Sequence, residues 1–262
     1  MKGIIGAICG DIIGSPYENN PIKTKEFELF HERSVFTDDT IMTLAVANWL
    51  IRNKTSSDEL IKELQYWGNM YPNAGYGRMF LNWLSEFHPK PYNSWANGSA
   101  MRVSPCAWAA DSLNEAQDLA RSSAVVTHNH PEGIKGALAT VDAVYLARTG
   151  FAKDEIKVHV ESEYGYDLDR SLDEIRPHYS FDVSCAGSVP ESIICFFEAK
   201  DFEDTVRNAV SLGGDADTQA AIAGSIASAY WDVPKSIADE AISRLDFSLL
   251  EVFNNFEEKF MD

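Results

Sequence analysis

The stretch Gly213–Tyr230, "GGDADTQAAIAGSIASAY", decides how we expect this chain to fold. Thr218 to Tyr230 is rich in alanine and glycine and has the character of a helix. Small side chains let neighbouring backbones come close, so this helix is expected at the centre of the molecule. Gly213 and Gly214 predict a tight turn immediately before it.

Helical periodicity recurs along the whole sequence, whereas runs of alternating β-branched residues are scarce. The stretch Ala152–Pro177 mixes charge, aromatics and glycine, and we interpret it as a loop with short helical turns. No solenoid repeat, low-complexity tract or linker stands out, which predicts one all-α domain over residues 1–262. The further predicted helices are Ile41–Ile51, Ser57–Trp67, Ala116–Val126, Pro131–Tyr145, Pro190–Phe197 and Phe202–Val210.

The composition excludes several classes of protein. Acidic residues outnumber basic ones by 40 to 22, a formal charge of −18, so binding to nucleic-acid backbones or anionic membranes is not expected. The four cysteines form no CxxC pair, and the first residues do not have the order of a secretory signal, so we expect a reduced cytoplasmic location. No apolar run is long enough to span a bilayer.

Acidic residues gather at two predicted helix starts. Asp215 and Asp217 precede Thr218, and "FTDDT" places Thr37, Asp38, Asp39 and Thr40 before a second apolar helix. Helix capping alone explains a single acid. If the two starts meet, however, each close pair of carboxylates costs about 4 kcal/mol at an effective dielectric constant of 20, which capping does not offset. An all-oxygen set of carboxylates and threonine hydroxyls suits one or two Mg²⁺ or Mn²⁺ ions.

The segment from Gly3 to Glu18 combines a packing face with two acids. Gly3, Gly6, Gly10 and Gly14 recur at spacings of three or four and predict a bare helix face for close packing. Asp11 is interpreted as a buried polar residue with a partner. Glu18 follows Pro16, where the helix should stop, so it is either a surface glutamate or free to enter a site.

Two further motifs favour ligand contact without proving it. In "WANGSAMRVSP", small residues flank Asn97 and Ser99, which is typical of a loop whose backbone N–H groups approach a phosphate and also of an ordinary turn. His128 and His130 precede Pro131, but no third histidine or cysteine stands at zinc-ligand spacing. A capping or ligand-contacting role is the better interpretation of these histidines.

Taken in order, "GDIIGSPYE", "FTDDT", "NGSAMR", "THNHPE" and "LGGDADT" resemble the ADP-ribosylglycohydrolase family over Gly3 to about Pro234. The resemblance implies a compact, orthogonal multi-helix domain with two divalent cations, Mg²⁺ or Mn²⁺. It implies metal ligation by Thr37, Asp38, Asp39, Asp215, Asp217 and Thr218, and catalysis by Glu18, Asp38 or Asp39. It also implies ligand binding by Asn97, Gly98, Ser99, Ala100, Met101 and His128.

The function implied is release of ADP-ribose from an ADP-ribosylated protein or a small ADP-ribosyl conjugate by cleavage at C1″. Two alternatives remain: a noncatalytic ADP-ribose-binding or crystallin-like structural protein, and a metal-dependent phosphohydrolase, since two hard cations also suit phosphoryl transfer. Ala96 and Asp232 stand where many members have glycine, away from the expected metal ligands. The sequence leaves the acceptor, the metal and the oligomeric state open.

Overall fold

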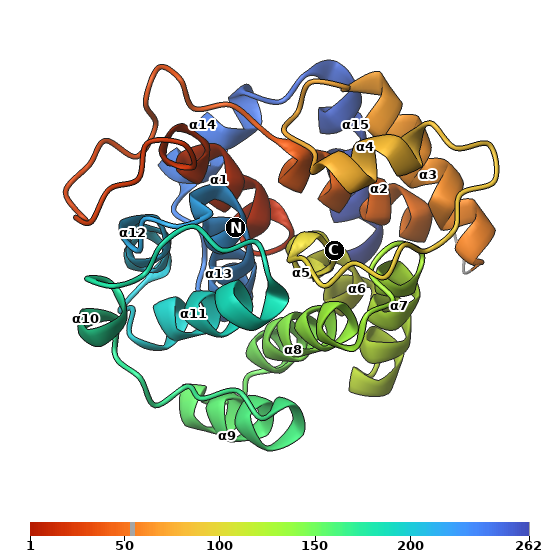
Figure 1. Ribbon diagram of the computed structural model, residues 1–262. Coiled ribbons are helices and arrows are strands. Elements are labelled where there is room, and N and C mark those ends of the chain that lie inside the picture. The colour runs from red at the N-terminus through yellow and green to blue at the C-terminus, as the bar shows by residue number, and fades with distance from the viewer. Residues whose placement is uncertain (53–55, 262) are drawn as a thin grey trace.

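The computed structural model describes residues 1–52 and 56–261. Within these ranges the regular structure is helical, and the single β-type pairing is the isolated bridge between Ala96 and Ser184. The prediction of one compact all-α domain is therefore confirmed (Figure 1). The helices are α1 (Ile5–Gly14), η1 (Ser15–Tyr17), α2 (Asp38–Ile51), α3 (Ser57–Met70), α4 (Arg78–Leu84), α5 (Gly98–Met101), α6 (Ser104–Ala109), α7 (Leu113–Val125), α8 (Pro131–Arg148), α9 (Lys153–Tyr164), α10 (Leu172–Ile175), α11 (Cys185–Phe197), α12 (Phe202–Ser211), α13 (Ala216–Tyr230), α14 (Lys235–Ser243) and α15 (Phe247–Phe260).

Helix α13 lies at the centre of the fold, as its small residues predict. Every residue of this helix except Tyr230 is buried, and α1, α8, α11 and α12 pack around it. The contact with α1 is backbone against backbone, because a Cβ added to Gly10 would lie 2.0 Å from the carbonyl oxygen of Ala220. A Cβ added to Gly6 would lie 2.3 Å from the carbonyl oxygen of Gly224. The predicted bare face of α1 is thus the face that meets α13.

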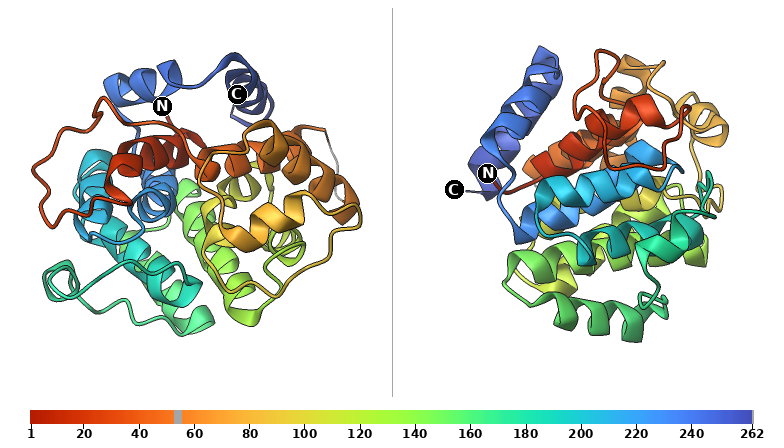
Figure 2. Two further views of the ribbon diagram at one scale, coloured as in Figure 1. Left: turned by 45° about the horizontal axis from the view of Figure 1, so that its top comes forward. Right: turned by 90° about the vertical axis from the view of Figure 1, so that its left-hand side faces the viewer.

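The other helices cover this pair on two sides. Helix α14 packs beside α1 and lies with α15 on one side, whereas α8 and then α9 lie on the opposite side (Figure 2). Among the described residues, no helix has both the length and the apolar character needed to cross a lipid bilayer. Cys9, Cys106, Cys185 and Cys195 are buried and free.

The prediction of an irregular segment at Ala152–Pro177 is wrong for its first half, which forms the 12-residue helix α9. Its apolar pattern is weak because Ile156 and Val160 are the only buried side chains of α9. Local contacts compensate: the Glu155 carboxylate accepts a hydrogen bond from the backbone N–H of Ala152 at 2.8 Å, and Gly165 ends the helix with a φ of 64°. The short helix α10 matches the helical turns that were expected.

Candidate functional site

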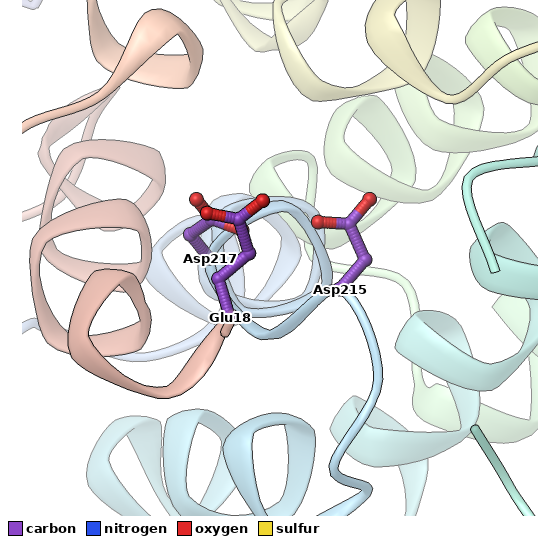
Figure 3. A group of neighbouring side chains, drawn as sticks. All are labelled: Glu18, Asp215 and Asp217. Carbon is purple, nitrogen blue, oxygen red and sulfur yellow. The ribbon is translucent and has the colours of Figure 1, made fainter. Parts of the chain in front are cut away.

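Three acidic side chains converge where the C-terminal end of α1, continued by η1, meets the N-terminal end of α13. Glu18 follows η1, Asp215 precedes α13, and Asp217 lies in the first turn of α13. One carboxylate oxygen of each lies within 4.8 Å of the others (Figure 3). The two aspartates are buried and Glu18 is half-buried. The helix N-terminus favours negative charge nearby but does not balance three carboxylates.

The two acidic helix starts that the sequence singles out do meet. The Thr218 hydroxyl at the start of α13 donates a hydrogen bond to Oδ2 of Asp39 at the start of α2, at 3.1 Å. Oδ1 of Asp39 is buried and has no hydrogen-bond partner among the described residues. Asp38 is half-buried and lines the same cavity as Glu18 and Asp217.

The electrostatic consequence is a set of acids with raised pKa values. Burial raises the pKa of Asp39 well above its usual range, and the charges of Asp11, Asp38 and Asp215 add to the effect. The pKa of Asp217 is raised in the same way, by burial first and then by Asp215 and Asp39. Burial, with Asp215 and Asp11, also raises the pKa of Glu18.

Asp11 forms hydrogen bonds with the first residues of α2 and the residue before it, which confirms its interpretation as a buried polar residue with partners. Its carboxylate accepts hydrogen bonds from the backbone N–H of Thr37 at 2.9 Å and from the Thr37 hydroxyl at 2.6 Å. It also accepts from the N–H of Thr40 at 3.1 Å and from the Thr40 hydroxyl. Thr37 Oγ1 in turn accepts from the N–H of Asp39, so Thr37 caps α2 and does not line the cavity.

These residues fit a divalent cation. The donors are all oxygens, which hard ions such as Mg²⁺ and Mn²⁺ prefer. Asp39 retains an unpartnered buried oxygen, and no lysine or arginine of the described chain forms an ion pair with the five acids Glu18, Asp38, Asp39, Asp215 and Asp217. A cation bound among them would offset both causes of their raised pKa values, the burial and the mutual repulsion.

The carboxylates lie in the lining of a cavity of about 410 Å³, a volume typical of small-molecule sites. Asn97 is part of this lining; it is buried and donates a hydrogen bond from Nδ2 to Oδ2 of Asp215 at 2.7 Å. Gly98 follows, and a Cβ added there would lie 3.1 Å from Nε2 of His128. A side chain at Gly98 would therefore crowd the imidazole that it faces.

His128 is held as a neutral base beside this wall. Its ring is buried, which lowers its pKa well below the usual value, and Arg102 lowers it further. Nη2 of Arg102 donates to Thr127 Oγ1 at 2.9 Å, and Thr127 Oγ1 lies 2.7 Å from Nδ1 of His128. When the Thr127 hydroxyl donates to Nδ1, the proton of the neutral ring lies on Nε2. The neighbouring His130 instead caps α8.

The predicted ligand loop divides between the cavity and the core. Asn97, Gly98 and Met101 line the cavity, as does His128, whereas Ser99 and Ala100 are buried behind it and are not part of the lining. The Ser99 hydroxyl donates to the carbonyl oxygen of Gly133 at 2.6 Å, which joins α5 to α8. Ser99 therefore supports the loop from inside the fold.

Sequence reasoning missed most of the remaining lining. The aromatic residues there are Phe80, Tyr92, Trp95 and Phe181, and Arg78 adds a cation. Trp95 opens the quoted stretch "WANGSAMRVSP", so its place in that motif could have suggested it. Phe181 arrives from a distant segment, which the 2.8 Å hydrogen bond from the N–H of Asn97 to the carbonyl oxygen of Val183 brings to the cavity.

Comparisons with known proteins agree with this arrangement. A family model described as ADP-ribosylglycohydrolase matches residues 1–259. ADP-ribosylhydrolase ARH3 of Mus musculus is 28% identical, with 89% of this chain and 84% of that protein covered. ADP-ribosylarginine hydrolase Tri1 of Pseudomonas putida (strain GB-1) is 25% identical, with 88% of this chain and 70% of that protein covered.

A solved structure described as an ADP-ribosylglycohydrolase-related protein complex has the same fold. It superposes with a TM-score of 0.75 at 22% identity and covers 97% of this chain and 95% of its own. The family model spans all the acidic residues of the site, and the helical fold that carries them is shared. The chain therefore belongs to the ADP-ribosylglycohydrolase family.

Proposed function

We propose that this protein is a divalent-cation-dependent hydrolase that releases ADP-ribose from an ADP-ribosylated protein or small conjugate by cleaving the bond at C1″. The observation that carries the proposal is the meeting of two acidic helix starts inside a cavity of ligand size. The names of the relatives ARH3 and Tri1 support the same reaction class.

The oxygen-rich cluster is the proposed metal centre. Asp38, Asp39, Asp215, Asp217 and Thr218 line the cavity and would hold two Mg²⁺ or Mn²⁺ ions, with Glu18 close enough to Asp215 and Asp217 to share one of them. Thr37 lies outside the lining, and its Oγ1, which already contacts Asp11 and the N–H of Asp39, would join the set through its remaining lone pair. When bound, such ions supply positive charge against the sugar hydroxyls and lower the pKa of a coordinated water. Asn97 and Thr218 orient Asp215 and Asp39 through their hydrogen bonds, so the carboxylates are positioned before a ligand arrives.

We assign the proton transfer to Glu18. Its carboxylate is half-buried at the cavity and accepts one hydrogen bond, from Nδ2 of Asn19 at 3.2 Å. Its raised pKa brings it closer to the range in which a carboxyl can hold or release a proton near neutrality. In the reaction, water adds to C1″, the bond to the acceptor breaks, the acceptor takes a proton, and ADP-ribose is released. Asp38 and Asp39 are the alternative proton carriers, but Oδ2 of Asp39 already accepts a hydrogen bond from the Thr218 hydroxyl.

The aromatic side chains in the cavity lining support binding of a nucleotide. Tyr92 lies beside His128, with ring centroids 6.1 Å apart, and Trp95 and Phe181 add exposed aromatic surface. Such faces suit a planar base. Asn97, Gly98 and Met101 would contact the diphosphate and the distal ribose, with Ser99 and Ala100 supporting them from behind.

The test is incubation with arginine-linked and serine-linked ADP-ribosyl peptides in MgCl₂ or MnCl₂, with products separated by chromatography. We expect free ADP-ribose, its loss on chelation with EDTA, and its loss in Glu18→Gln with ADP-ribose binding retained. Release of AMP or inorganic phosphate would instead identify a phosphohydrolase. Binding of both peptides without any release would identify a noncatalytic binding protein.

A further inference from the structure

The loop of residues 19–36 connects the two acidic parts of the site. It leaves Glu18 at one end and enters Thr37, Asp38 and Asp39 at the other, with no helix or strand between. Connections longer than roughly 15 residues without secondary structure are uncommon in compact domains. In Figure 1 the loop projects beside α12 and α14 at the edge of the molecule. Something outside the loop must therefore hold it in one conformation.

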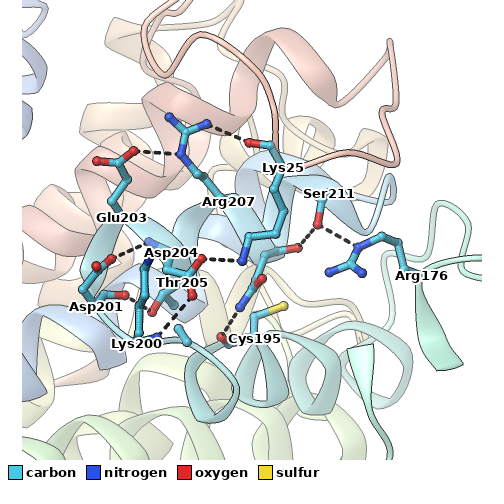
Figure 4. A network of polar contacts seen from close by, with 12 residues as sticks. Lys25, Arg176, Cys195, Lys200, Asp201, Glu203, Asp204, Thr205, Arg207 and Ser211 are labelled. Atoms are coloured by element: carbon cyan, nitrogen blue, oxygen red, sulfur yellow. Dashed lines mark hydrogen bonds and ion pairs between the residues drawn. The ribbon is translucent and has the colours of Figure 1, made fainter. Parts of the chain in front are cut away.

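Arg207 of α12 holds the half of the loop that follows Glu18. Its Nη1 donates hydrogen bonds to the carbonyl oxygens of Lys25 and Phe27, both at 2.8 Å. Its Nε donates to Glu203 one turn earlier at 2.8 Å, and the guanidinium lies 5.0 Å from the centre of the Phe27 ring. Figure 4 shows this arginine between Glu203 and the backbone of Lys25.

The contact continues from Arg207 to Glu18 through two aromatic rings. The Phe27 ring packs edge-on against Tyr17 with centroids 5.0 Å apart. Tyr17 directly precedes Glu18, and its hydroxyl donates to the carbonyl oxygen of Glu28 at 3.3 Å. Phe27 thus packs directly against the residue that precedes Glu18.

Arg244, the residue directly after α14, repeats the arrangement on the half of the loop that precedes Thr37. Its Nη1 donates to the carbonyl oxygens of Ser34 at 2.6 Å and His31 at 3.2 Å. Its Nε and Nη2 donate to Glu240 one turn earlier at 3.0 and 2.7 Å, and the guanidinium lies 5.2 Å from the centre of the Phe30 ring. Two helices thus use the same Glu and Arg spacing to bind the two halves of one loop.

We propose that Arg207 and Arg244 are positioning residues that hold loop 19–36 so that Glu18 faces the aspartates of α2 and α13. Both side chains are mostly buried, at 22% exposed, and hydrogen bonds from a charged donor are roughly twice as strong as neutral ones. The inference rests on the proposed function, because it explains how the proposed acid and the proposed metal ligands are kept in register.

Arg148 provides a matched control. It also donates to two carbonyl oxygens at the C-terminal end of α6, those of Trp108 at 2.6 Å and Ala110 at 2.8 Å. It also lies over an aromatic ring, that of Tyr145, at 5.1 Å. This end of α6 and the segment that joins α6 to α7 contribute no residue to the cavity. Loss of Arg148 thus reports the structural effect alone.

The experiment compares Arg207→Gln, Arg244→Gln and Arg148→Gln. Measurements are kcat and KM for an ADP-ribosyl peptide, MnCl₂ affinity by calorimetry, amide hydrogen exchange of residues 19–36, and the unfolding midpoint. We expect the two loop variants to lose kcat by about tenfold, since small misplacements of catalytic groups are costly, with KM changed less than about twofold. They should also bind Mn²⁺ more weakly and exchange loop amides faster. Arg148→Gln should lower the midpoint while leaving the other quantities unchanged.

The inference is overturned if the loop variants retain kcat, Mn²⁺ affinity and loop protection, or if Arg148→Gln reduces them equally. If Arg207→Gln does not fold, Arg207→Lys takes its place, because lysine keeps the positive charge but lacks the several N–H donors of a guanidinium. Unchanged Mn²⁺ affinity and loop exchange in Arg207→Lys would also overturn the inference. If the wild type binds Mn²⁺ but releases no ADP-ribose, the proposed reaction fails, while Mn²⁺ affinity and amide exchange still decide the role of the arginines.

Discussion

Replacing Asp217 by asparagine should stabilise the metal-free protein and weaken the stabilisation that a divalent cation provides. One oxygen of Asp217 lies within 4.8 Å of oxygens of Glu18 and of Asp215. At an effective dielectric constant of 20, two unit-charge pairs at that separation cost ~7 kcal/mol together. The metal-free protein avoids part of this cost by holding a proton, which at pH 7 costs ~4 kcal/mol for a carboxyl of ordinary pKa.

The gain from Asp217→Asn in EDTA is therefore bounded at ~4 kcal/mol. Because the remaining carboxyls redistribute their protons, we expect about half of that bound, or an unfolding midpoint higher by about 5 °C. Asparagine can keep the hydrogen bond that Asp217 Oδ1 accepts from the N–H of Thr218 at 2.9 Å. The substitution therefore loses little hydrogen bonding that would offset the reduced repulsion between carboxylates.

With cation present the advantage of the variant is lost. At a concentration 100 times its dissociation constant, Mg²⁺ stabilises the wild type by about 2.7 kcal/mol. If the lost ligand weakens binding about 100-fold, the same concentration stabilises the variant by only ~0.4 kcal/mol. The midpoint shift on adding MgCl₂ should thus be large for the wild type and small for Asp217→Asn.

The assay is thermal unfolding followed by circular dichroism at pH 7, in EDTA and in MgCl₂. Asp142 supplies the control, since this buried carboxylate accepts hydrogen bonds from Gln117, His159 and Tyr164. Asp142→Asn should unfold at a lower temperature in both buffers. A lower midpoint for Asp217→Asn in EDTA, or an undiminished shift with MgCl₂, would refute the reasoning.

Three further predictions address the ligand, the packing and the pH response. Arg78 lines the cavity and has no acidic partner among the described residues, so Arg78→Ala should weaken ADP-ribose binding about tenfold by calorimetry while leaving adenosine binding unchanged. An effect of equal size on adenosine would exclude a diphosphate contact. Gly10→Val should destabilise the fold by about 3 kcal/mol or more in urea unfolding, because even a Cβ would meet the Ala220 carbonyl oxygen at 2.0 Å; a loss below about 1 kcal/mol would contradict the packing. The His128 pKa is depressed in the folded state, so the unfolded chain binds the extra proton first, and stability should fall as pH drops below about 6.5. His128→Asn should show a shallower loss between pH 7 and pH 5, and identical slopes would argue against a buried neutral imidazole.

Much of the fold follows from local rules that the sequence displays directly. Helix periodicity and capping residues identify α2, α8 and α13, and Pro131 stands at the first position of α8 as expected. The small residues of α1 and α13 predict close packing because only glycine and alanine allow two backbones to touch. The helix α9 escaped prediction because two buried side chains make a weak pattern, and its stability comes from capping and from contacts with α8.

The sequence by itself determined which acids would be candidates, because aspartates in pairs at two helix starts are visible as a pattern. Only the tertiary structure decided that the two starts meet, through the hydrogen bond from Thr218 to Asp39, and that Ser99 and Ala100 face the core. It also decided that Phe181 reaches the cavity and that Arg207 and Arg244 hold the loop beside it. The physical reason is range: caps and periodicity act within one or two helical turns, whereas these contacts join residues far apart in the chain and form only when whole helices pack.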